Sequence, residues 1–565
     1  MPPRPPAVCL ARITTPAAVQ AAGSGRCASG RGRSARAGFR RQAGWRRHAG
    51  RSSRTDPGRR TPARLADGKA GCGRPKAGPV RAWAAERAGA RRRLSGDDTM
   101  FLCPRREFWH FASPMTRARA LADAALPDLP VLPGGGVLGH LRAMAAAPHS
   151  FPATALQAHD GIVALRLGPR RIAAIGRPDL AREVLVTRAD RYPRGRINRN
   201  LGAVIGDGLL ATEGDLWRAR RRRMQPSFRA DRLGPVAAAT EAAVAATTRR
   251  WTDGAPIDAG REAQRIAMRV IGRVLLSIDI ADGQGGAFAD AVQACLAQLM
   301  RRNWSLVRWP LWVPVPVNRA VNATRRTLEE FLGIELDRRL AGAPQPDDLL
   351  AALIRGRPED PPLPRAALLN ELKTLFAAGF ETTATALTWL LHLLARHPAV
   401  AEALREEAAP VLGGRAPLPG DLPRLPLAAA VVEEAMRLYP PVYNMGRDCA
   451  AEDALGGYRI PRGTTVLVSI FGIHRNPALW DAPEEFRPGR FLGAGAAARR
   501  NLLPYAWGRH QCIGNHFADL ELVVALLHIV QRVRLDPLET APVGLRGRTT
   551  LVPDRPIRLR PVPQR

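Results

Sequence analysis

The stretch 365–396 constrains the fold of this chain more than any other part of its sequence. Its residues are compatible with one continuous helix and are mostly apolar on every side. A helix of about 30 residues is about 45 Å long, which is the width of a whole domain. A helix that is apolar all round must be covered on all sides. We therefore expect a long buried helix at the centre of a large helical domain.

A polar interruption lies in the middle of this stretch, in the run Ala378-Gly-Phe-Glu-Thr-Thr383. Glycine and consecutive threonines are poor helix formers, and threonine hydroxyls can bond back to the preceding turn. The run therefore predicts a point where the helix kinks or opens. Taken alone, an acid and a hydroxyl at this point could also be a chance polar patch.

A second constraint is Cys512, which lies near two glycines, Gly508 and Gly514, where another apolar stretch begins. The apolar residues of that stretch recur with a helical period, and Asp519 and Glu521 fall on other faces; the periodic residues are Phe517, Leu520, Val524, Leu527 and Val533.

A cysteine at the amino end of a helix meets unpaired N–H groups and the positive end of the helix dipole. We expect these to lower the pKa of Cys512 and to present it as a thiolate to a metal. Gly508 and Gly514 suit the close approach of backbone to a flat ligand. A lone cysteine in such a place can equally be an inert buried thiol, and this interpretation stays open on these residues alone.

The remaining pattern predicts a mainly α fold with small β-sheets, that is, an α+β class. Alternating segments at 161–167 and 171–175 predict paired strands, and 457–470 returns to strand composition. Amphipathic stretches predict further helices at 235–252, 262–278, 286–302, 318–340, 398–412 and 425–438. The run Gly493-Ala-Gly495-Ala-Ala-Ala imitates a dinucleotide fingerprint but follows no apolar strand, so we expect a loop.

Charge separates the chain into two parts. Residues 1–114 hold 25 Lys and Arg against 6 Asp and Glu, which is more than half of the net charge of +35 in a fifth of the chain. We expect this Arg/Ala/Gly-rich tail to be disordered. It could be a nucleic-acid-binding arm or an organellar transit peptide, but we favour translated sequence upstream of a true start at Met115. The catalytic domain is then 115–565.

Cysteine spacing indicates a reducing compartment. Cys295, Cys449 and Cys512 lie outside the tail, and no Cys-x-x-Cys occurs, so we expect neither a disulfide framework nor a zinc site. No run of about 18 apolar residues is present, so we expect no transmembrane segment. These features favour the cytoplasm, with an organelle as the alternative if the tail is a transit peptide.

Two of these motifs resemble the cytochrome P-450 superfamily. The segment around Cys512 resembles the haem-binding loop Phe-x-x-Gly-x-Arg-x-Cys-x-Gly: Gly508, Cys512 and Gly514 match, Tyr505 stands for the phenylalanine and His510 for the arginine. The run Ala378–Thr382 resembles the oxygen-activation motif Ala/Gly-Gly-x-Asp/Glu-Thr at every position.

Further motifs resemble the same family. Glu434-Ala-Met-Arg437 together with Arg490 resembles the Glu-x-x-Arg triad that braces the haem loop, although Gly489 replaces the usual glutamate. By itself such an ion pair one turn apart is commonplace.

A basic run is similar to the family's Trp-x-x-x-Arg. Trp217 and Arg221 share a helix face at i,i+4, so the resemblance implies that they hold a haem propionate; Arg447 resembles another propionate ligand. His510 makes one propionate contact a titratable donor. The other arginines of the run, Arg218, Arg220, Arg222 and Arg223, would face outward as a positive surface for an acidic electron donor, not for nucleic acid.

The resemblance implies the cytochrome P-450 fold, with haem b (iron protoporphyrin IX) between the long central helix and the helix after Cys512. Cys512 is then the axial ligand of the iron, and Glu381 and Thr382 deliver protons. The implied activity is a monooxygenase that inserts one atom of O2 into a small apolar organic substrate, by hydroxylation or epoxidation. A peroxygenase, a P-450-type isomerase or a non-catalytic haem-binding sensor are the alternatives.

The resemblance also implies partners. Electrons come from NAD(P)H through a separate ferredoxin or flavodoxin-type donor and its reductase, and the protein is expected to be a monomer that binds no nucleic acid. The substrate pocket is expected to be lined from 190–210, from the region of Trp304, Trp309 and Trp312, from Ala378, and from Val442 and Tyr443.

Overall fold

The computed structural model describes residues 126–564, apart from 252–253, 281–291, 295–297, 299–308 and 494–495. The expected tail 1–114, Trp304 and most of the expected helix 286–302 lie outside the described residues.

Helices dominate the fold, as the sequence predicts. The longer ones are α6 (Arg196–Ile205), α7 (Gly214–Met224), α8 (Gly234–Thr248), α9 (Ala259–Leu276), α11 (Pro316–Leu340), α13 (Arg365–Arg396), α14 (Pro398–Leu412), α15 (Pro426–Leu438) and α18 (Asn515–Val530). Short α-helices are α3 (Leu141–Ala146), α4 (Ser150–Gln157), α5 (Pro178–Arg182), α12 (Leu349–Arg355), α16 (Ile470–His474) and α17 (Ala496–Arg499). Five shorter turns of 3₁₀- or π-helix are η1 (Glu183–Thr187), η2 (Gln225–Phe228), η3 (Ala230–Arg232), η4 (Pro419–Arg424) and η5 (Pro488–Phe491).

The strands form small sheets. A four-stranded sheet has the order β1 (Ile162–Leu167), β2 (Arg170–Ile175), β7 (Thr465–Ser469) and β4 (Asn444–Asp448). β1 and β2 pair with each other, as predicted; the pairing is antiparallel with Ile162 opposite Ile175, and β2 pairs parallel with β7. A three-stranded sheet has the order β3 (Ile257–Asp258), β11 (Arg558–Pro563) and β8 (Val533–Pro537). Two further pairs are β5 (Asp453–Leu455) with β6 (Tyr458–Ile460), and β9 (Leu545–Gly547) with β10 (Leu551–Pro553).

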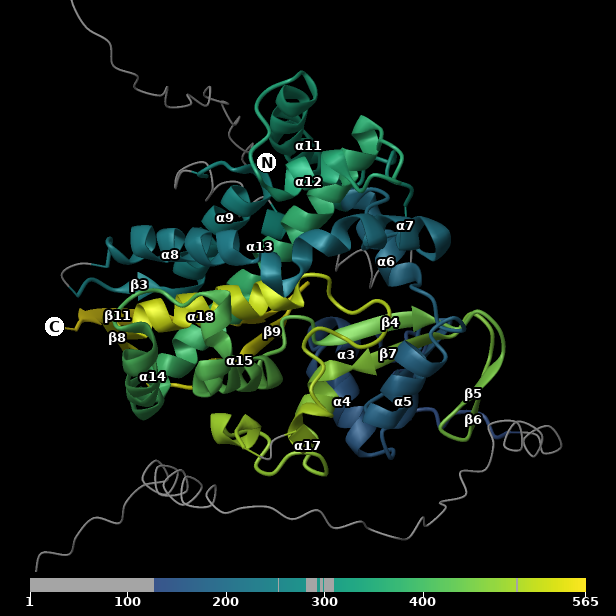
Figure 1. Ribbon diagram of the computed structural model, residues 1–565. Helices are drawn as coiled ribbons and strands as arrows, with labels where there is room; N and C mark the ends of the chain where they lie inside the picture. Colours follow the sequence, from purple (N-terminus) through teal and green to yellow (C-terminus); the bar gives the residue numbers. More distant parts are fainter. Residues whose placement is uncertain are drawn as a thin grey trace, which may run out of the picture. The chain divides into compact units, whose positions relative to one another are not determined.

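The expected central helix is α13, and its bounds are those that the sequence predicts. Figure 1 shows α8, α9, α13 and α18 lying together, while β4 and β7 lie beside α3, α4 and α5. Phe376, Phe380 and Trp389 of α13 are almost fully buried. Each such side chain contributes about 1.5–3 kcal/mol relative to exposure, so burial on all sides is what holds α13 at the centre.

Three expectations about these elements are wrong. The polar run does not open the helix, because α13 continues through it, and the Thr382 hydroxyl donates to the Ala378 carbonyl at 2.6 Å. Val533 is not on the last helix but begins β8. The run after Gly493 is not wholly a loop, because Ala496–Arg499 forms α17.

Within the described part of the chain, none of the helices is both long enough and apolar enough to cross a membrane.

Candidate active site

A cavity of about 790 Å³ brings the two main sequence motifs together. Cys512 lines it, and so do Ala378, Glu381 and Thr382 of α13. Its remaining wall is largely aliphatic, from α6 and the loop after it, from α9 and from the segment after α15; these residues include Leu201, Ile205, Leu209, Leu210, Ile271, Val442 and Tyr443. Ala378 and Cys512, which lie 134 positions apart in the sequence, thus line one cavity.

Cys512 is held by a tight turn before α18. Its backbone N–H donates to the Tyr505 carbonyl at 2.9 Å, and the Gln511 N–H donates to Gly508 at 3.0 Å. Gly508 has φ +76°, and a Cβ there would lie 2.1 Å from the Leu185 carbonyl oxygen. Only glycine fits both constraints, so Gly508 makes the turn possible.

The expected low pKa of Cys512 is wrong for the protein surroundings alone. α18 begins at Asn515, three residues later, so Cys512 does not occupy the first turn of the helix. Its thiol is accessible from the cavity but is otherwise surrounded by protein. Burial raises the pKa of the Cys512 thiol, and this outweighs the lowering by the Gly514 N–H and by Arg221. A bound metal ion would reverse this balance, because it is the largest local charge.

Tyr505 and Asp519 form a partly buried pair beside this turn. The Tyr505 hydroxyl donates to Asp519 Oδ1 at 2.6 Å. Burial raises the pKa of Asp519 to about 6, although the hydrogen bond from Tyr505 lowers it. The hydroxyl that distinguishes tyrosine from the family's phenylalanine therefore has a partner in this chain.

Basic and N–H donor side chains cluster at one end of the cavity. The predicted residues Arg221 on α7, Arg447 on β4 and His510 line the cavity there, and the predicted Trp217 of α7 packs against His510, with ring centroids 4.4 Å apart. Arg221 donates to the Gln511 carbonyl at 2.6 Å, which ties α7 to the cysteine loop. Trp217 Nε1 is buried and has no hydrogen-bond partner among the described residues.

Sequence reasoning missed two members of this cluster. Arg194 is buried, donates to the Leu209 carbonyl at 2.6 Å, and has its guanidinium carbon 5.9 Å from the Trp217 ring. Burial lowers the pKa of both Arg194 and Arg447 to about 10. Glu213 Oε1 lies 3.1 Å from His510 Nε2. No motif or periodic pattern in the sequence marks either residue, because Arg194 lies in a loop and Glu213 precedes α7.

The expected outward arginines of α7 divide into two kinds. Arg218 and Arg222 are exposed, as predicted. Arg220 and Arg223 are buried, so the prediction is wrong for them. Arg220 lies 3.2 Å from the buried Glu371 of α13, and Arg223 donates to the carbonyls of Leu353, Ile354 and Pro361 at the end of α12.

The acid of α13 has a hydroxyl partner from a distant part of the chain. Glu381 Oε1 accepts a hydrogen bond of 2.9 Å from the Thr550 hydroxyl, in the turn between β9 and β10. Burial raises the pKa of Glu381, and the hydrogen bond from Thr550 lowers it. Thr382 is half-buried at the cavity wall. Thr550 was missed because 169 residues separate it from Glu381 and it has no motif of its own.

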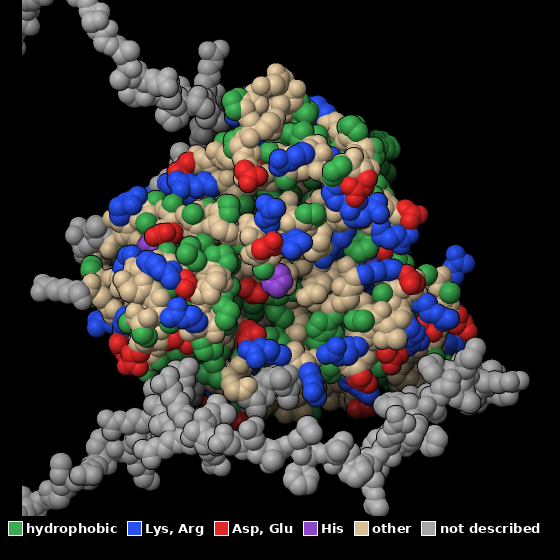
Figure 2. All heavy atoms as spheres, viewed as in Figure 1, with side chains coloured by type: hydrophobic (Ala, Val, Ile, Leu, Met, Phe, Trp, Pro, Cys, Tyr) green, Lys and Arg blue, Asp and Glu red, His purple; other side chains and the backbone are tan. Residues whose placement is uncertain are grey.

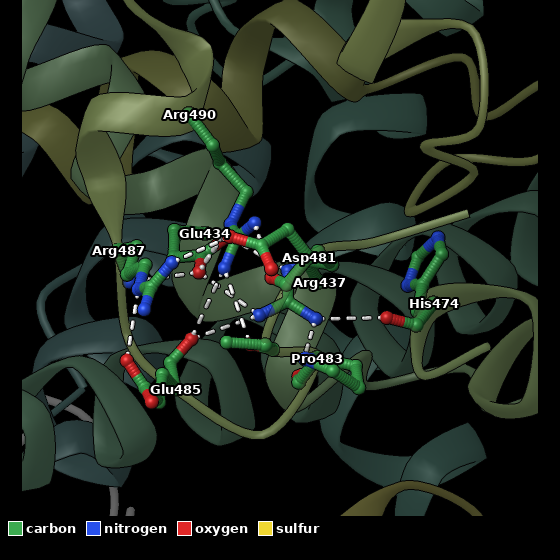
Figure 3. Close-up of polar contacts among 9 residues, drawn as sticks. Glu434, Arg437, His474, Asp481, Pro483, Glu485, Arg487 and Arg490 are labelled. Atoms are coloured by element: carbon green, nitrogen blue, oxygen red, sulfur yellow. Dashed lines mark hydrogen bonds and ion pairs between the residues drawn. The ribbon is translucent and has the colours of Figure 1, made fainter. Parts of the chain in front are cut away.

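The residues of the predicted triad contact one another (Figure 3), and none of the three lines the cavity. Arg437 donates to both oxygens of Glu434 at 2.7 and 2.9 Å, and Arg490 Nε donates to Glu434 Oε1 at 2.9 Å. Arg437 also donates to the carbonyls of His474 and Pro483, at 2.8 and 2.7 Å. Glu434 and Arg437 are fully buried, so the network joins α15 to the segments 474–490.

The prediction of which residues line the substrate pocket is confirmed in part. The 190–210 segment, Ala378, Val442 and Tyr443 line the cavity. Trp309 and Trp312 do not; their side chains are exposed.

Comparison with known proteins agrees with this geometry. The sequence model of the family described as "Cytochrome P450" matches residues 127–560, and the chain therefore belongs to the cytochrome P450 family. It is 33% identical to cyclooctatin synthase of Streptomyces melanosporofaciens over 77% of this chain and 95% of that protein. It is 33% identical to pentalenene oxygenase of Streptomyces avermitilis over 75% of this chain and 95% of that protein.

A solved structure shares the fold. It is described as "Retinoic acid bound cyanobacterial CYP120A1" and aligns with a TM-score of 0.69 at 21% identity, over 78% of this chain and all of that chain. Together with the family match and the monooxygenases among its relatives, these findings make the protein a cytochrome P450 monooxygenase, a class that uses haem and O2.

Proposed function

We propose that Cys512 is the axial ligand of the haem iron and that Glu381 and Thr382 deliver protons in the same cavity. One observation carries this proposal: the thiol of Cys512 and the acid–threonine pair of α13 line one cavity of about 790 Å³. When bound, a thiolate-ligated haem supplies oxygen activation, because the thiolate pushes electron density toward the iron and favours O–O cleavage.

The donor cluster fits the carboxylates of a haem. Arg447, buried on β4, donates to the neighbouring Gly446 carbonyl, and Trp217 Nε1 has no partner within the described residues. Buried donors of this kind are costly unless an acceptor reaches them. We infer that Trp217, Arg221, Arg447 and His510 hold the propionates, and that Arg194 joins them.

The structural residues support the ligand loop in this proposal. Tyr505, Gly508 and Gly514 shape the turn that presents Cys512. Glu434, Arg437 and Arg490 brace the segment that leads to it.

Glu381 and Thr382 have different roles in proton delivery in this proposal. Thr382 keeps its hydroxyl proton on the Ala378 carbonyl, 2.6 Å away at the cavity wall, and can turn it toward a guest. Glu381 has a raised pKa, which brings it nearer to neutral pH, where a group both accepts and gives up protons most readily. In this proposal Glu381 takes protons from solvent and passes them to the cavity, and Thr382 holds them there.

We propose a small to medium apolar substrate that is hydroxylated or epoxidised, and within that class a terpene. The aliphatic lining from α6, α9 and the residues after Pro441 supports an apolar guest. Among its relatives, pentalenene oxygenase and cyclooctat-9-en-7-ol 5-monooxygenase bear names of terpene-oxygenating enzymes. Titration of the purified protein with terpenes, fatty acids, steroids and aromatics should shift the haem absorption most strongly with terpenes. A strong response confined to fatty acids would contradict this class.

The electron donor in this proposal is an acidic ferredoxin or flavodoxin, reduced from NAD(P)H by its own reductase. Arg218 and Arg222 of α7 are exposed, and Figure 2 shows Lys and Arg side chains gathered over α6 and α7. Such a field steers acidic partners. NAD(P)H consumption that depends on both a ferredoxin and a substrate would support the proposal.

For the chain as a whole, we propose that 115–565 is the catalytic domain and that 1–114 has no part in the reaction. The family match begins at residue 127, which supports this boundary. A chain that starts at Met115 is then expected to bind haem as the full chain does. The cysteine spacing supports a cytoplasmic, reducing location, and a monomer is the expected state.

The decisive experiment is Cys512→Ser. The reduced parent protein treated with carbon monoxide should show the red-shifted Soret band of thiolate-ligated haem, and Cys512→Ser should lack it. Cys449→Ser is the matched control, because Cys449 is buried and donates to the Ala451 carbonyl away from the cavity. Retention of the band in Cys512→Ser would disprove the ligand assignment.

A further inference from the structure

The turn between β9 and β10, residues 548–550, is fastened in place at the cavity. The Tyr443 hydroxyl donates to the Arg548 carbonyl at 2.6 Å, and Trp389 Nε1 of α13 donates to the Leu551 carbonyl at 2.7 Å. The Leu551 N–H donates to the Pro441 carbonyl at 3.1 Å. Three bonds from two other elements therefore hold both ends of this turn, and Thr550 lies between them.

Two threonine hydroxyls form a directed chain that ends on Glu381. Thr385 Oγ1 of α13 donates to Thr550 Oγ1 at 3.0 Å, and Thr550 donates to Glu381 Oε1 at 2.9 Å. The exposed fractions of Thr385, Thr550 and Glu381 are 5%, 2% and 6%. Because each hydroxyl has one proton, Thr385 occupies the acceptor side of Thr550 and leaves its proton to point at the carboxylate.

Few other groups act on Glu381. Burial raises the pKa of its carboxyl, whereas hydrogen bonds from the Thr550 hydroxyl and from the Gln293 side chain lower it, as does the positive charge of Arg548 in the same turn. Over the residues that the structure describes, no Lys, Arg or His nitrogen comes within 4.0 Å of this carboxylate. A buried carboxylate whose donors are neutral depends on each donor more than a carboxylate paired with a guanidinium does, and Thr550 is the donor that this turn holds in place.

We propose that Thr550 is a positioning residue for proton delivery: its hydroxyl, set by Thr385 and by the fastened turn, holds the Glu381 carboxyl in the orientation from which protons reach the cavity. This rests on the proposed function of Glu381. In each transfer Glu381 gains one proton from solvent and releases one to the cavity, while both threonines keep their own protons.

Thr550→Val tests this directly, because valine has the shape of threonine but no hydroxyl. Infrared difference spectra over a pH series follow the protonated carboxyl band of Glu381, which Glu381→Gln identifies by its absence. Thr550→Val should raise the midpoint of that band by roughly one pH unit, since a hydrogen bond that favours the anion is lost. Product formed per NAD(P)H should fall roughly fivefold, with hydrogen peroxide in its place.

Two further variants separate positioning from packing. Thr550→Ser keeps the hydroxyl and should restore both the band midpoint and the yield of product. Thr549→Val removes a neighbouring hydroxyl that has no hydrogen-bond partner among the described residues, so it should leave the Glu381 midpoint unchanged.

The outcomes distinguish this inference from the proposed function. If all variants show the thiolate Soret band but Thr550→Val leaves both the Glu381 midpoint and the yield unchanged, Thr550 is not a positioning residue, while the haem assignment stands. If the parent protein lacks that band, the proposed function itself fails. A midpoint that moves equally in Thr549→Val and Thr550→Val would show a general packing effect and would also overturn the inference.

Discussion

Glu434 on α15 and Glu381 on α13 are both buried glutamates on long helices, but their partners differ. Glu434 accepts hydrogen bonds from two guanidinium groups, those of Arg437 and Arg490, and from the Arg487 backbone N–H at 2.9 Å. Glu381 accepts hydrogen bonds from neutral side chains, the Thr550 hydroxyl at 2.9 Å and the side chain of Gln293. Two guanidinium groups therefore surround the first carboxylate, whereas the second has neutral hydrogen-bond donors, and burial raises its pKa.

This difference explains why one side chain type serves two purposes. A carboxylate whose charge is compensated on all sides orders the chain around it, and here it joins α15 to the loop before Cys512. A buried carboxylate held by neutral donors can exchange a proton, and proton delivery to a cavity requires such an exchange. The number and charge of its partners, not the residue type, therefore distinguish the structural glutamate, Glu434, from the proton-delivering glutamate, Glu381.

The largest expected effect is on the structural network around Glu434. Glu434→Ala should lower the free energy of unfolding by about 3–5 kcal/mol, because it leaves Arg437 buried without a counter-charge. Denaturant titration measures this. Glu433→Ala is the matched control: its partner Arg499, at 2.8 Å, is 44% exposed, so about 0–1 kcal/mol is expected. Equal losses in the two variants would contradict the comparison.

The second prediction concerns proton delivery by Glu381. Glu381→Gln should lower product formation about 100-fold, the size of a general acid–base contribution, while the protein still folds and binds haem. Product, hydrogen peroxide and NAD(P)H consumption are measured together with denaturant unfolding. A large loss of folding stability with an unchanged amount of product per NAD(P)H would show that Glu381 has a structural role like that of Glu434.

A third acid extends the comparison through pH. Glu521 of α18 is buried, its partner is the hydroxyl of Thr383, and burial raises its pKa to about 8. A carboxyl whose folded pKa exceeds its unfolded value contributes stability below the ordinary glutamate pKa, and this is lost as pH rises toward 8. Relative to Glu521→Gln, the parent protein should therefore lose about 1–3 kcal/mol between pH 5 and 8. A difference between the two proteins that does not change with pH would show that Glu521 does not titrate in this window.

The smallest effect should come from the arginines at the edge of the Glu434 network. Arg490→Lys removes a planar donor that bridges Glu434 and the Asp481 carbonyl, at 2.9 and 3.0 Å, and should cost about 1 kcal/mol. Arg487→Lys, whose side chain pairs with the exposed Asp481 and Glu485, should cost close to nothing. Unfolding midpoints for the two variants decide whether contact with buried Glu434 is what matters.

Local patterns predicted much of this molecule because they depend on residues close in sequence. The periodicity of 365–396 predicted α13 to the residue, and alternation predicted the pairing of β1 with β2. The end of the last helix was wrong, since Val533 continues the apolar pattern but pairs in β8 opposite Pro563 of β11. Periodicity cannot distinguish a helix turn from a strand when the deciding partner is distant.

Side-chain environments were predicted less well. Arg220 and Arg223 belong to a basic run that reads as a solvated face, yet Glu371 and the carbonyl end of α12 bury them. Cys512 was expected in a helix turn that lowers its pKa, and three residues of loop together with burial reverse the shift. Burial and helix ends depend on which elements pack, and no short window of sequence contains that information.

By itself, the sequence determined the central helix, the motifs around Cys512 and Glu381, and the pair Glu434 and Arg437 one turn apart, because each depends on covalent spacing and local periodicity. Only the tertiary structure decided that Arg194 joins the donor cluster, that Glu213 lies beside His510 as an acceptor, and that Thr550 reaches Glu381. The physical reason is that a buried charge is stabilised by whichever donors the packed chain brings within hydrogen-bond distance, and long-range packing, not spacing along the chain, chooses them.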